Sequence, residues 1–136
     1  MREIKFRAWI TDYALMTDVN FMNIDYKEIV VMIDENDYEF NCGEYELMQY
    51  TGLKDKNGTE IYEGDIVRFN DFWGEISGGN VSDTIRTCLV EYSISSFLLI
   101  DVLDEEYEED LGMALINDDE FEVIGNVYEH PHLLGD

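Results

Sequence analysis

The stretch that decides the fold runs from Leu47 to Val67 and reads LMQYTGLKDKNGTEIYEGDIV. Its centre, Asp55-Lys56-Asn57-Gly58, contains an Asn-Gly pair. This pair favours the positive φ angles of a type I′ turn, which joins two twisted antiparallel strands. The pattern therefore predicts a hairpin whose arms are residues 48–54 and 59–62.

Short segments with high β propensity continue on both sides of this hairpin. Residues 29–33 are rich in β-branched side chains and are followed by the turn-forming run Asp34-Glu35-Asn36-Asp37. Residues 10–26 indicate a loop with short extended pieces, and 44–50 suit a helical turn or a strand. The other expected strands cover residues 2–9, 38–42, 66–69, 88–92, 97–103, 113–116 and 121–128. This pattern indicates an all-β fold of small barrel-like or sandwich modules, with short antiparallel strands and little helix.

The length of 136 residues fits a single domain over 1–136, with two β modules sharing a core, about 1–68 and 69–136, as the alternative. Aromatic residues make up 13% of the chain, which is too many for an acidic disordered protein. The expected core side chains are Leu53, Ile61, Ile66, Val67, Val123 and Ile124. Tyr50, Tyr62 and Tyr128 are interpreted as half-buried core residues, with a ligand-stacking surface as the alternative.

The chain is strongly acidic, with 32 Asp and Glu against 8 Lys and Arg and a net charge of −24. Arg86 is the single base after residue 68. Such a surface repels nucleic acid and anionic lipid, so we expect neither direct nucleic-acid binding nor membrane binding. The field favours basic proteins or cations as partners. The block Asp104-Glu105-Glu106-Tyr107-Glu108-Glu109-Asp110 is expected to be a solvated loop.

The compartment follows from two negative signals. No apolar run of signal-peptide length follows the basic start, and no stretch approaches the roughly 20 apolar residues of a membrane span. Cys42 and Cys88 are interpreted as free, buried thiols, although one disulfide bridge would also be possible. We therefore expect a protein of the bacterial host cytoplasm.

Tests for nucleotide and calcium motifs fail on specific positions. The glycines from Gly74 to Gly79 lack the lysine and hydroxyl residues of a P-loop. A calcium loop with Gly58 at its sixth position would need ligands where Leu53 and Gly64 stand. Residues 70–84 are expected to form a loop.

Candidate catalytic and metal-binding residues are equally hard to find. His130 and His132 flank Pro131 and would share a face of an extended segment, which allows a weak metal site, but exposed tail histidines are the simpler interpretation. They are also the only available bases for a Ser or Cys nucleophile. We predict no catalytic, cofactor-binding or metal-binding residue, and no cofactor.

Three motifs together carry a family resemblance. The stretch from Leu47 to Val67, the start REIKFRAW at 2–9 and the segment VIGNVYE at 123–129 resemble the YopX family of phage and prophage proteins. The chain departs from this family at Ile10, where an Asp commonly follows the Ala-Trp pair, and the acidic block matches no family motif. The resemblance implies a mainly β fold of barrel-like or sandwich modules and self-association. It implies no activity and no catalytic residue.

The sequence thus favours a non-enzymatic phage or prophage accessory protein that acts by protein binding or self-assembly. The expected partner is a host or phage protein of basic character, and a sharper version is mimicry of nucleic acid in a basic groove. A homo-oligomer is expected, with Arg2, Lys5 and Arg7 of the N-terminal strand as a candidate contact. The alternative is a small metal-dependent hydrolase or nucleotide-processing enzyme that uses Asp and Glu.

Overall fold

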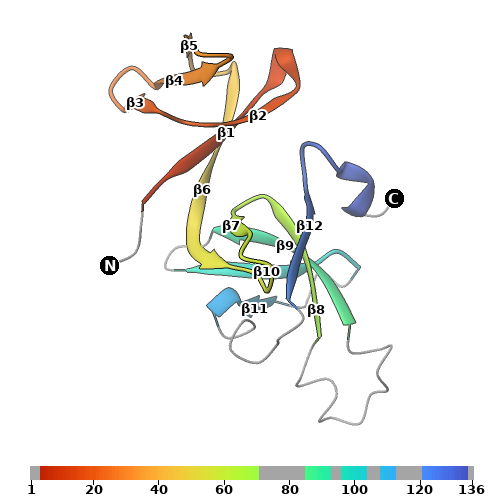
Figure 1. Cartoon of the computed structure of the whole chain (residues 1–136). Coiled ribbons are helices and arrows are strands. Elements are labelled where there is room, and N and C mark those ends of the chain that lie inside the picture. The colour runs from red at the N-terminus through yellow and green to blue at the C-terminus, as the bar shows by residue number, and fades with distance from the viewer. Residues whose placement is uncertain (1–3, 71–84, 93–95, 104–107, 113–120, 135–136) are drawn as a thin grey trace. The chain divides into compact units, whose positions relative to one another are not determined.

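The computed structural model describes residues 4–70, 85–92, 96–103, 108–112 and 121–134. Within these residues strands dominate, and the helical elements are short turns such as η1 (Thr11–Tyr13) and η3 (Pro131–Leu134). The prediction of an all-β fold is therefore confirmed (Figure 1). The strands are β1 (Phe6–Ile10), β2 (Leu15–Asp18), β3 (Phe21–Asn23), β4 (Glu28–Ile33), β5 (Asn36–Phe40), β6 (Tyr45–Lys54), β7 (Glu60–Tyr62), β8 (Asp65–Asn70), β9 (Ile85–Tyr92), β10 (Phe97–Asp101), β11 (Glu108–Asp110) and β12 (Glu122–Asn126).

The chain divides into two compact units, Met1–Tyr50 and Thr51–Asp136. The long strand β6 passes from the first unit into the second, so it belongs to both. Residue 68, the boundary considered from the sequence, lies inside β8. The number of domains stays a prediction, and each unit is described by itself.

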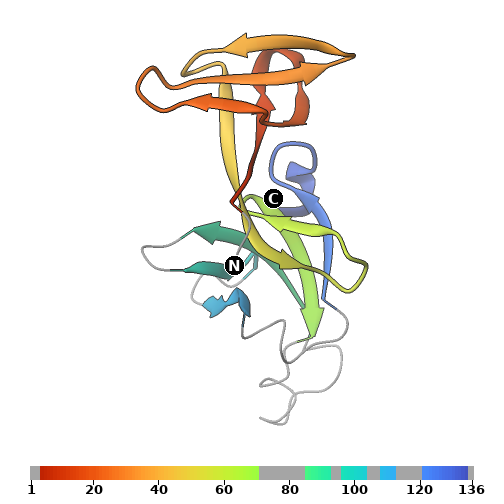
Figure 2. The ribbon, with the colours of Figure 1, turned by 60° about the vertical axis from the view of Figure 1, so that its left-hand side comes forward.

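The first unit contains two small sheets that share one apolar core. Strand β1 pairs with β2 on one side and with β6 on the other, whereas β3, β4 and β5 form a separate antiparallel sheet. Alternation along β4 buries Ile29 and Val31, which pack with Ala8 and Ile10 of β1 and with Phe40 of β5. Figure 2 shows the orange strands of the β3–β5 sheet side by side. The period of two along β4 thus gives this three-stranded sheet a buried inner face and a solvent-facing outer face.

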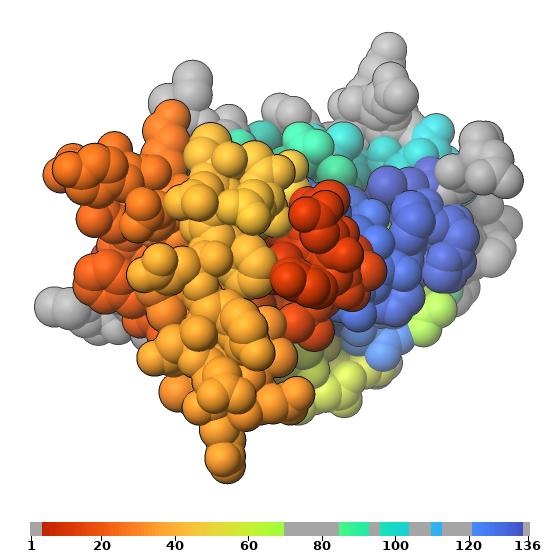
Figure 3. Space-filling model, turned by 90° about the horizontal axis from the view of Figure 1, so that it is seen from above, coloured from red at the N-terminus to blue at the C-terminus, as the bar shows by residue number. Residues whose placement is uncertain are grey.

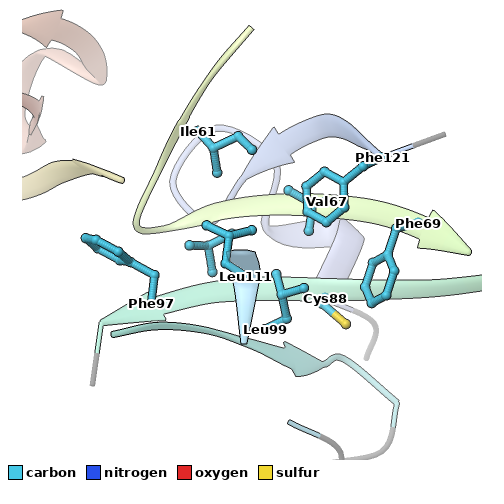
Figure 4. Packing of buried hydrophobic residues seen from close by; sticks show 9 residues of the cluster. Ile61, Val67, Phe69, Cys88, Phe97, Leu99, Leu111 and Phe121 are labelled. Atoms are coloured by element: carbon cyan, nitrogen blue, oxygen red, sulfur yellow. The ribbon is translucent and has the colours of Figure 1, made fainter. Parts of the chain in front are cut away.

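The second unit is built on a five-stranded antiparallel sheet with the order β11-β10-β9-β8-β12. Its inner face carries the larger core of the protein, in which the rings of Phe69 and Phe121 stack with centroids 5.4 Å apart. Cys88 lies fully buried in this cluster (Figure 4). Ile61, Ile66 and Val67 are buried as predicted, but Leu53 is 37% exposed, so its assignment to the core is wrong.

The central turn at Asp55-Lys56-Asn57-Gly58 joins β6 to β7, but it is not the predicted type I′ turn. Gly58 has a φ of +81°, whereas Asn57 is not among the residues with positive φ. The Gly58 N–H donates to the Asp55 carbonyl at 3.0 Å, and the Asp55 N–H donates to the Thr59 carbonyl at 2.9 Å. This is a type I turn followed by a left-handed glycine, the usual three-residue hairpin loop.

Other local predictions need correction. The returning strand β5 starts at Asn36 rather than at residue 38, because Asp34 and Glu35 alone make the turn with φ values of +51° and +71°. Part of the acidic block is not a loop, because Glu108–Asp110 forms β11 against β10. The loop expected at 70–84 starts one residue too early, because Asn70 is the last residue of β8. The rest of the acidic block, the remaining residues 71–84 of that loop and the strand expected at 113–116 lie outside the described residues.

Candidate functional site

A pocket of about 290 Å³ opens at the surface of the first unit. Its lining residues are Tyr13 of η1, Leu15 of β2, Ile33 of β4 and Tyr38 of β5. Aliphatic and aromatic side chains therefore form its wall, and the two tyrosine hydroxyls are the polar groups available to orient a ligand. A concave, mostly apolar site with few polar groups is typical of ligand and peptide binding.

The strand register explains why Ile33 and Tyr38 face this pocket. Tyr38 lies opposite Val31, and Ile33 lies opposite Asn36, across the β4–β5 ladder. Directly opposite residues share a face of an antiparallel sheet. Tyr38 and Ile33 therefore share the inner face with the buried Val31, at the end of the sheet where the core is open.

The other side of the pocket is positioned by a tight turn. Ala14 adopts a left-handed conformation with φ 49° and ψ 48°, and it separates η1 from β2. The Tyr13 ring meets the Phe40 ring edge-on, with centroids 5.9 Å apart and planes at 70°. Tyr13 is nevertheless 66% exposed and Tyr38 43% exposed, so both rings offer contact area to a partner.

Four carboxylates lie close to these lining residues in the sequence. Asp12 precedes Tyr13, Asp34 and Glu35 follow Ile33, and Asp37 precedes Tyr38. All four are exposed, and within the described part of the chain none of them forms an ion pair. We call these four carboxylates, each within two residues of a lining residue in the sequence, the acidic rim. An apolar wall with carboxylates so near in the chain suits a ligand that carries both an apolar group and positive charge.

The carboxylates of the central motif have a different role, because the fold itself uses them. Asp55 is 7% exposed, and its two oxygens accept the N–H groups of Asn57, Thr59 and Val123 at 2.8, 2.9 and 2.9 Å. Asp65, which is 1% exposed, accepts the Tyr62 N–H at 2.8 Å. These side chains hold turns in place, and this accounts for their position in the motif.

A third buried carboxylate, Asp101, is also structural. It accepts the Leu103 N–H at 2.7 Å and pairs with Arg86 at 2.9 Å. Among the described residues, no group of three or more His, Cys, Asp or Glu is arranged to hold a metal ion.

The two histidines lie in and beside η3 rather than on an extended segment. The Asn126 N–H donates to His130 Nδ1 at 3.2 Å, and the rings of His130 and His132 lie 6.1 Å apart at 74°. Gly125 makes room for this packing, since a Cβ there would lie 2.8 Å from His130 Nδ1. His130 is therefore a structural contact of β12, whereas His132 is exposed.

The cysteines and a neighbouring tyrosine also correct the sequence interpretation. Cys42 is exposed in the turn before β6, so only Cys88 is buried, and both thiols are free. Burial raises the pKa of Tyr45 above its ordinary value of 10.0, and the charge of Cys42 adds to this effect. The Tyr45 hydroxyl donates to the Lys27 carbonyl at 2.7 Å.

The N-terminal strand proposed for self-association lies inside its sheet. Strand β1 is paired on both edges, and Lys5 lies with its Nζ 5.0 Å from the centre of the Tyr50 ring.

The site that the structure does present was missed, because Tyr13 and Tyr38 belong to no motif. One signal was available in the sequence: Tyr38 stands between Asp37 and Glu39, the alternation of an edge strand with one aromatic face.

The fold and pocket define a small all-β protein with an acid-rimmed apolar site. The YopX protein family model matches residues 5–135, and the chain therefore belongs to the YopX family. Protein EF1440 from Enterococcus faecalis has a similar structure, with 28% identity, a TM-score of 0.63, and coverage of 98% of this chain and 99% of that one.

The protein YopX from Bacillus subtilis shares the fold at 19% identity, with a TM-score of 0.61 and coverage of 98% of each chain. A search among curated proteins found no match. No helix in the described residues is long and apolar enough to cross a membrane.

Proposed function

We propose that this protein is a binding module that captures a basic segment of a host or phage protein at the pocket of its first unit. The observation that carries the proposal is an open apolar wall, formed by Tyr13, Leu15, Ile33 and Tyr38, together with the acidic rim, whose carboxylates form no ion pair among the described residues. The matching ligand is an apolar side chain flanked by Lys or Arg. We extend the proposal to a role in the cytoplasm of a bacterium carrying a phage or prophage.

The energies suit a reversible contact. Burying one Leu- or Phe-sized side chain in the pocket contributes about 1.5–3 kcal/mol. Each exposed ion pair at the rim adds about 0.2–1 kcal/mol and weakens as salt screens it. The acidic field of the whole chain also accelerates encounters with a basic partner, because it attracts that partner over a distance. Capture should therefore depend on the pocket and on ionic strength together.

A capture experiment with matched tyrosine variants tests this function. The full chain, its Tyr38→Ser variant and its Tyr26→Ser variant are immobilised and exposed to host lysate at roughly 50 and 500 mM salt. Tyr26 is the matched control because it is 73% exposed in the same unit and does not line the pocket. We expect a basic protein that the original chain and Tyr26→Ser retain at low salt.

The same protein should be lost from Tyr38→Ser and released at high salt. Equal retention by the two tyrosine variants would overturn the pocket as the capture site. An acidic captured protein, or one indifferent to salt, would overturn the electrostatic part of the proposal. Metal-dependent hydrolysis, the other candidate function, has no specific observation among the described residues in its favour.

A further inference from the structure

Strand β5 is a free edge in the described part of the first unit. The sheet order β3-β4-β5 pairs β5 with β4 alone, and Asn36, Asp37, Tyr38 and Glu39 are all exposed. Figure 3 shows the orange segment that contains β3 to β5 at the surface of the molecule. An edge strand presents backbone donors and acceptors on which another strand can pair.

The hairpin geometry decides which backbone groups face outward. Ile33 and Asn36 close the two-residue turn made by Asp34 and Glu35, and this closing pair exchanges both of its backbone hydrogen bonds across the hairpin. Bonded and non-bonded pairs alternate along an antiparallel ladder. The N–H and C=O groups of Asp37 and Glu39 therefore point away from β4, toward the free edge.

The side chains of β5 alternate between the two faces of the sheet. Tyr38 faces the pocket, whereas Asp37 and Glu39 share the outer face with their partners Met32 and Val30. An added antiparallel strand would place one set of its side chains beside Tyr38 and the other set beside the two carboxylates. Apolar residues suit the first set, and Lys or Arg suits the second.

We infer that β5 accepts an extended segment of the partner protein, with alternating apolar and basic residues, as an additional antiparallel strand. This inference rests on the proposed function and specifies how the same pocket is used. A second copy of this chain is the less suitable occupant, since pairing β5 with β5 would bring the carboxylates of Asp37 and Glu39 close to their own counterparts. The pairing would give affinity through the backbone and selectivity through the pocket and rim.

The register predicts a difference that a peptide can reveal. In such a complex each basic residue lies directly opposite Asp37 or Glu39, so its own backbone N–H points at β5. The N–H groups of the apolar residues point the opposite way, into solvent. Methylating the backbone nitrogens of the basic residues must therefore block pairing, whereas methylating those of the apolar residues must not.

The test uses labelled peptides of about eight residues in which Lys and Val alternate, with fluorescence anisotropy as the readout on the full chain. Four peptides are compared: unmodified, methylated on the Lys nitrogens, methylated on the Val nitrogens, and a block peptide with all Lys before all Val. We expect similar Kd values for the unmodified and Val-methylated peptides. The Lys-methylated and block peptides should bind about tenfold or more weakly.

A protein variant pair provides the second measurement. Glu39→Pro removes the outward N–H from β5, and edge strands tolerate proline at such a position. Glu39→Gln removes the same charge and keeps the N–H. The unmodified peptide should bind Glu39→Gln more tightly than Glu39→Pro, with circular dichroism confirming that both variants fold.

The outcomes separate the inference from the function beneath it. Equal binding of the Lys-methylated peptide overturns strand addition, and the proposed function then stands if Tyr38→Ser still weakens that binding. Absence of binding by all four peptides up to about 1 mM also overturns strand addition, while the lysate capture decides the function independently. Light scattering could also show that the original chain has a mass above that of one chain, and that Glu39→Pro reduces it to the mass of one chain. That result would assign the edge to a second copy and overturn the inference.

Discussion

Replacing the buried carboxylate of Asp55 by an amide tests whether the central motif is structural. In Asp55→Asn, the remaining side-chain oxygen can still accept the N–H groups of Asn57 and Thr59, which bond to Asp55 at 2.8 and 2.9 Å in the original chain. The new NH₂ group, however, faces the Val123 N–H, which bonds to the carboxylate at 2.9 Å in the original chain. One hydrogen bond to a charged group is replaced by two opposed donors.

The expected cost follows from that single lost bond. A hydrogen bond to a charged group contributes about 1.5–3 kcal/mol, and the orphaned N–H of Val123 is only partly exposed. We therefore expect Asp55→Asn to lower the free energy of unfolding by about 2 kcal/mol, which corresponds to a fall in Tm of about 6–8 °C for a chain of this size. The Val123 amide should also exchange with deuterium faster than in the original chain.

Urea unfolding followed by far-ultraviolet circular dichroism measures this cost. Asp25→Asn is the matched control, because Asp25 is exposed and its carboxylate accepts no hydrogen bond from a described residue. That variant should stay within about 0.5 kcal/mol of the original chain. If Asp55→Asn also stays within that range, the carboxylate does not hold the turn against β12, and the structural account of the motif is wrong.

Three further changes have outcomes that can be stated in advance. Replacing Asp34 by Asn and Glu35 by Gly should raise the free energy of unfolding by about 1–2 kcal/mol, since both have positive φ; an unchanged thermal melt would contradict this. Gly125→Ala should lower it by about 1–3 kcal/mol, because the new Cβ would lie 2.8 Å from His130 Nδ1; equal urea midpoints would count against that packing. Tyr45→Phe should change how the free energy of unfolding depends on pH. The raised pKa of Tyr45 stabilises the native state fully below pH 10.0 and ceases to do so as pH rises through the native-state pKa. The stability advantage of the original chain over Tyr45→Phe should therefore shrink in urea series from about pH 8 to 11.5, and a constant difference would refute this reasoning.

The fold was predictable from the sequence because it depends on local signals. The β-branched run at 29–33 and the glycine-marked turns at Gly58 and Gly64 specify strands and connections directly. The type of the central turn was not predictable from Asn-Gly alone. The Asp55 carboxylate binds the N–H groups of the loop and favours a type I turn, while the type I′ geometry occurs at Asp34-Glu35, where Glu35 stands in place of the usual glycine.

The candidate site was not predictable, because it depends on contacts between distant segments. Three strands, β2, β3 and β4, lie between Tyr13 and Tyr38 in the sequence. The two tyrosines meet at one pocket only through the packing of the β3–β5 sheet on β1 and β2. Burial of single residues shows the same limit. Cys42 is exposed because it lies in the turn that follows β5, and no local pattern in the sequence distinguishes it from Cys88.

The central claim is that the pocket and edge of the first unit capture a basic segment. Its most direct test is a titration of the ¹⁵N-labelled full chain with the alternating Lys-Val peptide, followed by amide chemical shifts. The account predicts that the shifted amides cluster at residues 12–15 and 33–39, and that Tyr38→Ser suppresses the shifts. Shifts clustered within Thr51–Asp136, or shifts that survive unchanged in Tyr38→Ser, would contradict it.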